Sequence, residues 1–383
     1  MTRPLDGLLV ADFSRVLAGP LATSMLADLG ARVIKVERPG SGDDTRSWGP
    51  PWTGPSGSSS SYFECANRSK ESIALDLDDP GDLAVAQRLA ARADVLVENF
   101  RDGTLARRGL DHATLRQVNP RLVYCSVTGF GSAGGADLPG YDFLVQAVGG
   151  LMSITGDADG APTKVGVALV DVLTGKDAVI GILAALAERE RSGRGQRVEV
   201  NLLSSLLGSL ANQASSYLTT GEAPVRMGNQ HPSIAPYETL RCKDDLLAVC
   251  CGNDAQFRRL CAVLGAPDLV DDERFATNPA RVAHRTELVP ALEARLSVET
   301  AAEWAVRLTA GGVAAGRVGD VADGFALAEA LGLDPVVPVP GAAPQVRHPV
   351  RYERSPVTHY AASPRLGQHG DEIRRWLEEE ASP

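Results

Sequence analysis

One acidic residue, Asp171, lies in the otherwise apolar second half of the stretch PTKVGVALVDVLTG, residues 162–175. The run 165–170 is β-like, and the run 171–196 has apolar residues at helical spacing, so we expect Asp171 at a strand-to-helix junction. An aspartate there can accept backbone N–H groups and stabilise the helix by about 0.5–2 kcal/mol. The same carboxylate could act as a nucleophile. The position alone favours the cap and leaves both interpretations open.

Three further candidates follow predicted strands. Arg38 comes just after the strand 31–37, and Asn99 and Phe100 end the strand 94–100. Open α/β sheets bind ligands at the carboxyl ends of their strands. A cation, an amide and an aromatic ring in that place suit a nucleotide with phosphates, although solvated surface residues would give the same pattern.

Several other chemistries lack their sequence motifs. The segment after the first predicted strand has no G-x-G-x-x-G, which disfavours nicotinamide chemistry. Walker, H-E-x-x-H and G-x-S-x-G motifs are also missing from the sequence. The cysteines form no C-x-x-C pair and no metal-ligand spacing with the histidines, so we expect no metal site. The cysteines are expected to be small buried hydrophobes: Cys65, Cys125, Cys242, Cys250, Cys251 and Cys261.

The composition is that of an ordinary globular protein. The chain has 383 residues, 44% hydrophobic content and a net charge of −10. This length predicts two lobes, because single cores rarely exceed about 250–300 residues. The negative charge argues against a nucleic-acid partner. We find no membrane span and no signal peptide, and therefore expect a cytoplasmic protein that does not bind membranes.

Strands and helices alternate in the first half, which predicts a doubly wound α/β domain with right-handed crossovers. The stretch 40–61, rich in Gly, Pro and Ser, predicts an exposed loop without regular elements that covers a site. The expected strands are 7–13, 31–37, 72–77, 94–100 and 121–130, and the expected helices are 20–30, 80–93 and one that begins near residue 111.

The second half adds a smaller α+β lobe. After the helices 171–196 and 198–218, we expect a hairpin within 237–252 and a Pro-rich return to the first domain. The predicted later helices are 255–265, 285–297, 300–312 and 370–380. The predicted domains are a large one over 1–220, a small one over 221–325, and a return to the large one over 326–383.

Six blocks in order along nearly the whole chain carry a resemblance to a known family. They are PLDGLLVADFSRVLAGP, LGARVIKVERPGSGD, VLVENF, GYDFLVQAVGGLMSITG, GILAALAERERSGRGQRVEV and PRLGQHGDEI. Together they resemble the class III CoA-transferases, a family that includes formyl-CoA transferase and is homologous to the α-methylacyl-CoA racemases. The resemblance implies a Rossmann-like large domain built from both chain ends, a small domain between them, and an interlocked homodimer.

The resemblance also implies a reaction and a nucleophile. In this family an aspartate attacks the thioester of a donor acyl-CoA, and the position that matches it is Asp171. A mixed anhydride forms first, and the CoA thiolate then converts it into an aspartyl-CoA thioester, which the acceptor carboxylic acid attacks. CoA and acyl-CoA are substrates, and no tightly bound cofactor is expected. The family match favours catalysis at Asp171 over the cap.

A CoA site follows from the same resemblance. Arg38 and Arg107 match cations that face the CoA phosphates, a task that suits guanidinium groups. Core packing or surface solvation would be the alternative roles of these matching residues. The remaining positions that match the CoA and acyl path are Val16, Ala18, Leu75, Asn99, Phe100, Tyr141 and Asp142.

Departures from the family pattern bear on the reaction and the substrate. Tyr141 stands where the racemases have an acid/base histidine, which disfavours racemisation. Racemisation of a 2-methylacyl-CoA is therefore the alternative reaction. A non-catalytic CoA-binding protein is the third hypothesis. Leu17 replaces a glutamine that contacts oxalate in formyl-CoA transferase. The loop 227–237 replaces a glycine-rich loop and resembles that of succinyl-CoA:glutarate CoA-transferases, where Asn229 or His231 would meet an acceptor carboxylate.

Overall fold

The computed structural model describes residues 3–53 and 59–379. Contacts within the chain divide it into two compact units, which we describe separately. The large unit comprises the chain up to Leu151, Lys164–Gly221 and the chain from Asp334 onward. The small unit comprises Met152–Thr163 and Glu222–Leu333.

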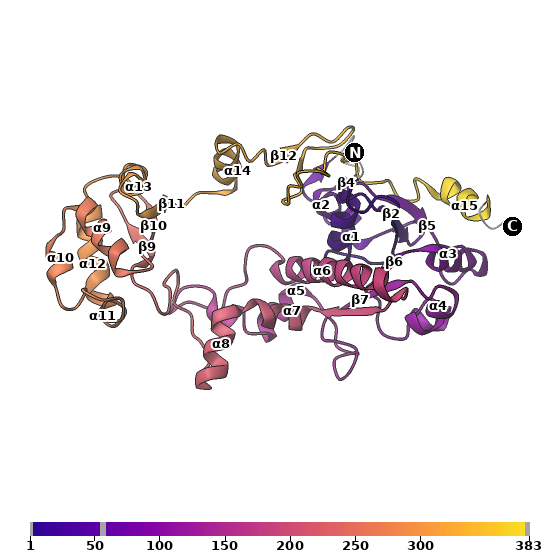
Figure 1. The fold of residues 1–383 in the computed structure, drawn as a ribbon, viewed down its shortest axis with the longest axis horizontal. Coiled ribbons are helices and arrows are strands. Elements are labelled where there is room, and N and C mark those ends of the chain that lie inside the picture. Colours follow the sequence, from indigo (N-terminus) through magenta and orange to yellow (C-terminus); the bar gives the residue numbers. More distant parts are fainter. Residues whose placement is uncertain (1–2, 54–58, 380–383) are drawn as a thin grey trace. The chain divides into compact units, whose positions relative to one another are not determined.

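A six-stranded, fully parallel sheet forms the centre of the large unit (Figure 1). Its order is β5-β2-β1-β6-β7-β8, so the first strand lies in the middle and the chain changes direction between β1 and β6. This order is that of doubly wound folds, and the predicted parallel α/β sheet is confirmed. The strands are β1 (Leu9–Asp12), β2 (Arg32–Glu37), β5 (Glu71–Ala74), β6 (Val95–Glu98), β7 (Val123–Thr128) and β8 (Arg197–Asn201).

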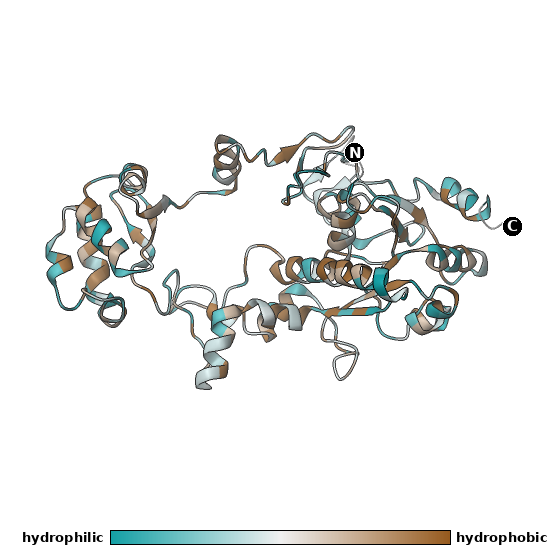
Figure 2. Cartoon of the chain, in the orientation of Figure 1, coloured by the Kyte–Doolittle hydropathy of each residue, from teal (hydrophilic) through white to brown (hydrophobic). Residues whose placement is uncertain are grey.

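Helices cover both faces of this sheet because successive strand residues point to opposite sides. Val10 and Val97 pack into one apolar cluster with residues of α1, α6 and α7. Their neighbours Ala11 and Leu96 pack into a second cluster with α3, α4 and α15. Figure 2 shows hydrophobic residues along α6, part of which packs in the first cluster. The helices of this unit are α1 (Ala18–Asp28), α2 (Ser61–Asn67), α3 (Pro80–Arg92), α4 (His112–Val118), α5 (Asp142–Val148), α6 (Leu169–Ser192), α7 (Leu202–Ser209), α8 (Ala211–Thr220) and α15 (Gly370–Glu379).

Helix α15 closes the edge of the sheet at β5 and α3. Ile373 and Leu377 are fully buried in the second apolar cluster. Arg374 Nη2 donates to Asp82 Oδ1 at 2.6 Å, and the backbone N–H of His369 donates to the carbonyl of Ser72. Residues near both ends of the chain thus build one layer.

The small unit is an antiparallel sheet packed against helices. The hairpin of β9 (Tyr237–Arg241) and β10 (Leu246–Cys250) confirms the one predicted within 237–252, and β11 (Ala314–Arg317) pairs with β10. Its apolar core includes Leu247 and Trp304. The helices here are α9 (Asp254–Leu264), α10 (Asp268–Asp271), α11 (Asn278–Ala283), α12 (Arg285–Leu296), α13 (Ala301–Ala310) and α14 (Val321–Ala330).

The boundary of the small unit differs from the predicted 221–325. Residues 152–163 belong to it because Gly228 N–H donates to the carbonyl of Gly156 and Arg226 Nη1 to the carbonyl of Ser153. The unit also extends to Leu333. The periodicity of the sequence could not predict these hydrogen bonds, because they join residues that are far apart in the chain.

Two predicted elements are wrong. Residues 165–168 form no strand, and α6 begins at Leu169, so Asp171 does not follow a strand. The predicted helix 198–218 is instead β8 followed by α7 and α8. The alternating Val198 and Val200 pair with the free edge of β7 and pack against the first apolar cluster, and this tertiary pairing overrides helical spacing.

The stretch 40–61 is more ordered than predicted. It contains a 3₁₀ helix, Asp44–Ser47, and a two-residue strand pair, β3 (Trp52–Thr53) with β4 (Ser59–Ser60). Asp43 caps the 3₁₀ helix by accepting the N–H of Thr45 at 3.0 Å. Residues 54–58 of the predicted loop lie outside the described residues.

The shorter remaining elements are β12 (Val336–Val337), β13 (Gln345–Val346) and two 3₁₀ helices, Ala106–Arg108 and Met152–Ile154. Cys65 on α2 is exposed, and Cys242 and Cys250 are only half-buried, which corrects the expectation that all six cysteines are buried. In the described parts of the chain, no helix combines the length and apolar character needed to cross a membrane.

Candidate active site

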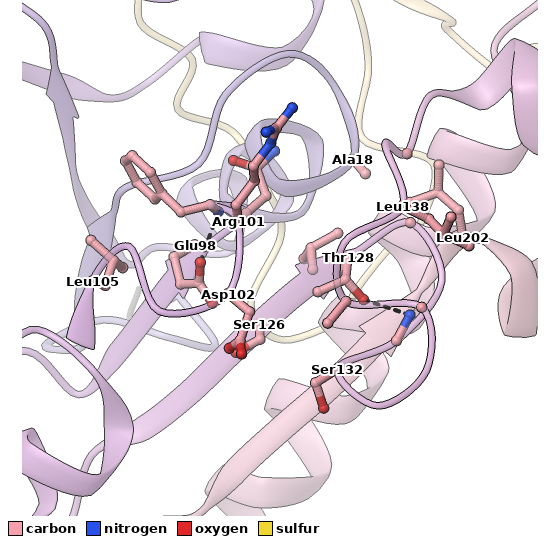
Figure 3. A pocket seen from close by; sticks show the side chains of 18 of the residues that line it. Ala18, Glu98, Arg101, Asp102, Leu105, Ser126, Thr128, Ser132, Leu138 and Leu202 are labelled. Atoms are coloured by element: carbon pink, nitrogen blue, oxygen red, sulfur yellow. Dashed lines mark hydrogen bonds between the residues drawn. The ribbon is translucent and has the colours of Figure 1, made fainter. Parts of the chain in front are cut away.

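A cavity of about 550 Å³ opens at the carboxyl edge of the sheet, where the chain changes direction between β1 and β6. The segments after β1, β6 and β7 line it. Figure 3 shows Glu98, Arg101 and Asp102 on one part of its wall and Leu138 and Leu202 on another. Doubly wound folds bind ligands at this place because the loops on either side of the switch point diverge there.

The turn between β1 and α1 forms one wall and is held in an unusual backbone shape. Val16 has φ 72°, a left-handed conformation that L-residues with branched side chains rarely adopt. Its N–H points at the Asp43 carboxylate, 3.3 Å from each oxygen. Asn99 holds the preceding residue on both sides, accepting the Arg15 N–H at 2.9 Å and donating to the Arg15 carbonyl at 2.8 Å. The turn is therefore fixed from β6 as well as from residue 43.

Charged side chains without solvent exposure lie behind this turn. Lys35 Nζ is 2.9 Å from Asp43 Oδ2 and donates to the Ser14 carbonyl at 2.8 Å. Lys70 Nζ is 2.9 Å from Asp12 Oδ2. Burial alone would raise the pKa of Asp12, but the two ammonium groups hold it far below its ordinary value. Burial lowers the pKa of Lys70 to about 8.

Asp171 lies in the first turn of α6 and lines the cavity, but it does not cap the helix. Asp142, on α5, takes that role: its Oδ1 accepts the N–H groups of Val170 at 2.8 Å and Asp171 at 3.3 Å. Within the described residues, the Asp171 carboxylate accepts no hydrogen bond. The side chain whose position had suggested a cap is thus left available for chemistry.

The surroundings of Asp171 disfavour its charge. Burial, and then the nearby Asp142 carboxylate, raise the pKa of Asp171 to about 7. Tyr62 on α2 lies close enough to both carboxylates to be affected by them, and burial followed by the charge of Asp171 raises its pKa to about 12. A carboxylate with a raised pKa and no partner is a typical catalytic group.

The structure brings half of the twelve predicted site residues together in one cavity. The large cavity is lined by Val16, Ala18, Asn99, Phe100, Tyr141 and Asp171. Leu75 and Arg38 instead line a second cavity of about 160 Å³, and Arg38 pairs with Asp44, which lines the large one. Arg15 and Phe100 line both cavities.

Four predicted residues lie away from these cavity walls. Arg107 is exposed on a 3₁₀ helix, and Asp142 sits behind Asp171. Asn229 and His231 belong to the small unit, where Asn229 Nδ2 donates to Thr239 Oγ1 at 3.1 Å and His231 Nδ1 accepts the Ser233 N–H at 3.1 Å. Their role toward a substrate stays a prediction.

Sequence reasoning missed several polar residues of the site. Arg15 adjoins the matched Val16 and could have been found from that adjacency. Glu98 ends β6, and burial raises its pKa. Tyr62 and Gln146 lie far from Asp171 in the chain, so no local pattern indicates them. No group of three or more His, Cys, Asp or Glu is placed to hold a metal ion among residues 3–53 and 59–379.

Comparisons with known proteins agree with this fold and site. A model of the CoA-transferase family III matches residues 5–370. The succinate–glutarate CoA-transferase of Agrobacterium fabrum is 45% identical over 98% of this chain and 96% of that protein. The succinyl-CoA:glutarate CoA-transferase of Mus musculus is 42% identical over 96% of this chain and 85% of that protein.

A solved structure gives the same result. A CAIB/BAIF family protein from Brucella suis superposes with a TM-score of 0.89 at 45% identity and covers 98% of this chain and 100% of that chain. Similarity of this extent, in sequence and in backbone, covers nearly all of the chain. The chain belongs to CoA-transferase family III and is itself a CoA-transferase.

Proposed function

We propose that the protein moves CoA between a succinyl-type acyl-CoA and a dicarboxylic acid of the glutarate type, with Asp171 as the covalent nucleophile. The observation that carries this proposal is the Asp171 carboxylate, which accepts no hydrogen bond from any described residue and lines a cavity at the switch point of the sheet. The substrate class rests on the names of relatives that share 42–45% of their residues with this chain.

The reaction needs no resident cofactor, since one thioester replaces another. An ionised Asp171 oxygen attacks the thioester carbon of the donor, and the C–S bond breaks to give a mixed anhydride and CoA thiolate. The thiolate attacks the Asp171 carbonyl carbon and releases the donor acid. The acceptor carboxylate then attacks the carbonyl carbon of the aspartyl-CoA thioester, and the C–S bond breaks to give a second anhydride and CoA thiolate. The thiolate finally takes the acceptor acyl group and Asp171 leaves as carboxylate.

The protein's part in this sequence is mainly positioning and protection. The turn at Val16 and the segment around Tyr141 form walls around Asp171, which keeps both anhydrides close to the thiolate that must attack them. The half-buried position of the nucleophile removes part of its hydration shell before reaction and limits hydrolysis of the intermediates.

The two cavities together provide room for CoA. Arg15 and Phe100 line both, so one extended ligand could occupy the two. In this proposal Arg38 and Arg107 face the phosphates, while Leu75, Asn99 and Phe100 surround the adenosine. Val16 and Ala18 line the pantetheine path, and Asn229 or His231 meets the acceptor carboxylate.

We propose that a second copy of the chain completes the protein, as an interlocked homodimer. No residue of α14 is buried within the chain, even though several of its residues are apolar. Val321 is 78% exposed, and Leu331, the C-cap of the helix, is 65% exposed. Helix α8 likewise has no buried residue, and Leu218 is 81% exposed. Apolar surface of this extent is costly in water unless a partner covers it. The cytoplasmic location and the lack of nucleic-acid or membrane partners stay predictions.

The test is to trap the intermediate. The protein is incubated with succinyl-CoA, treated with hydroxylamine or borohydride, digested and analysed by mass spectrometry. Modification of Asp171, together with loss of transfer to glutarate in Asp171→Ala, is expected. Undiminished transfer by Asp171→Ala would refute the assignment. Deuterium incorporation at the α-carbon without an acceptor acid would instead support the racemase alternative, and CoA binding without turnover would support the non-catalytic one.

A further inference from the structure

The side chain of Gln146, on α5, is fully buried and uses both ends of its amide. Its Nε2 donates to Asp142 Oδ2 at 2.7 Å, and its Oε1 accepts the N–H of Val165 at 2.9 Å. Nε2 also lies 3.5 Å from the carbonyl of Val167. A carboxylate can only accept and an N–H can only donate, so only one orientation of the amide satisfies both partners.

The bonds continue from Gln146 to the nucleophile. The second oxygen of Asp142, Oδ1, accepts the N–H groups of Val170 and of Asp171 itself. A chain of hydrogen bonds therefore runs from Val165 through Gln146 and Asp142 to the first turn of α6. Both oxygens of Asp142 are used, one to hold the helix and one to be held by Gln146.

This chain of bonds matters because the segment before α6 has no sheet partner. Residues 161–168 form neither helix nor strand, and an added Cβ at Gly166 would meet no atom within 4 Å. The amide of Gln146 is the link between this segment and α5 at Val165 and Val167. Without this amide, the backbone of residues 165–167 would lose the contacts that hold it against α5 just before α6 begins.

We propose that Gln146 is a positioning residue for the transfer reaction: it orients Asp142 and residues 165–167 so that the first turn of α6 presents Asp171 to the cavity. This inference rests on the proposed role of Asp171 as nucleophile. Gln146 itself does not line the cavity and touches no reacting atom.

Two substitutions separate the bonds that Gln146 makes. Gln146→Met keeps the length of the side chain and removes both hydrogen-bonding ends. Gln146→Glu keeps an acceptor for the Val165 N–H and, when ionised, removes the donor to Asp142. The introduced carboxyl group, when protonated, could donate to Asp142 again, so the loss in this variant should depend on pH.

The experiment measures kcat, KM for succinyl-CoA, the affinity for CoA and the pH profile of transfer. We expect Gln146→Met to lower kcat at least 10-fold with the CoA affinity within twofold of the wild type. We compare the kcat of Gln146→Glu with that of the wild type as a ratio, because this removes the titration of Asp171 that both proteins share. The ratio should rise as pH falls. Among the described residues, the titratable groups coupled to Asp171 are Asp142 from α5 and Tyr62 from α2.

A matched control is Asn119→Leu. The Asn119 amide also holds backbone groups at both ends, donating to the Ala93 carbonyl at 2.8 Å and accepting the Arg121 N–H at 3.2 Å, but it lies away from both cavities. This variant should lose thermal stability and keep kcat and the pH profile. If Gln146→Met does not fold, as judged by circular dichroism, Gln146→Glu carries the test through its pH dependence.

The outcomes distinguish this inference from the proposed function. A wild-type protein without transfer and without an adduct at Asp171 overturns the proposed function. A wild type that transfers CoA, with Gln146→Met equal to it in kcat or Gln146→Glu at a constant ratio across pH, overturns the role of Gln146 and leaves the function intact.

Discussion

At the scale of single residues, the site depends on two aspartates with different tasks. Asp142 accepts backbone N–H groups and the Gln146 amide, so its carboxylate is committed to structure. Asp171 is half-buried beside it, and its carboxylate has no hydrogen bond among the described residues. A protein that stabilises one carboxylate and leaves its neighbour unsatisfied keeps the second reactive.

The raised pKa of Asp171 predicts a pH dependence for the first half-reaction. Only the ionised carboxylate attacks the thioester, and its pKa of about 7 means that the ionised form is lost as pH falls through 7. The rate of adduct formation, followed by rapid quench and mass spectrometry, should therefore rise between about pH 6 and 8. Asp142→Asn removes the neighbouring charge and should shift the midpoint to lower pH. A wild-type midpoint near 4 would contradict this prediction.

The same shift predicts that the nucleophile destabilises the fold. A carboxyl group whose pKa is raised from 3.8 to about 7 binds more protons folded than unfolded between these pH values, so stability falls as pH rises through them. At pH 8, Asp171→Asn should be more stable than the wild type by on the order of 1–3 kcal/mol and therefore unfold at a higher temperature. At pH 4 the two melting temperatures should converge. An equal difference at both pH values would point to a cause other than ionisation.

At the scale of elements, a buried ion pair supports the turn that lines the cavity. Lys35 is bonded to Asp43, which in turn faces the Val16 N–H. Lys35→Met leaves the Asp43 charge buried without this partner and should cost about 3–5 kcal/mol in denaturant unfolding. Arg38→Met is the comparison, since its pair with Asp44 is about half exposed and should contribute at most about 1 kcal/mol. Equal losses would argue against a special role of burial.

Close contact between α1 and α6 gives a second prediction at this scale. A Cβ added at Gly175 would lie 2.8 Å from the backbone carbonyl of Ala18. Gly175→Val should therefore push α6 away and lower kcat at least 10-fold, because Asp171 lies one turn earlier on the same helix. Gly208→Ala on α7 meets no atom within 4 Å and should leave kcat unchanged and stabilise the helix slightly. Steady-state kinetics of both variants tests this.

Elements of the large sheet could be predicted because alternating β-branched residues and helix-ending glycines act locally. The strand assigned to 165–170 was wrong because an apolar run does not reveal whether a partner strand exists. Asp171 was found through the family resemblance, whereas its release from capping depends on Asp142, which is distant in the chain. Lys35 looks like an ordinary polar residue in its strand, and only the fold shows that it is buried with Asp12 and Asp43.

At the scale of the whole molecule, the uncovered helices predict assembly. Replacing Leu327 and Leu331 of the α14 region with aspartate should weaken the proposed dimer, which light scattering coupled to size-exclusion chromatography can measure. Val118→Asp, at an isolated exposed valine on α4, should leave the molecular mass unchanged. A wild-type protein with the mass of one chain would contradict the proposal of a homodimer.

The placement of α15 has a consequence for synthesis. Because Ile373 and Leu377 seal the layer over α3 and β5, that layer stays open while the ribosome makes the intervening residues. The nascent chain therefore exposes the apolar surface over α3 and β5 to solvent for most of its translation. Chaperone contact during translation should concentrate there and end once residues 370–379 emerge from the exit tunnel.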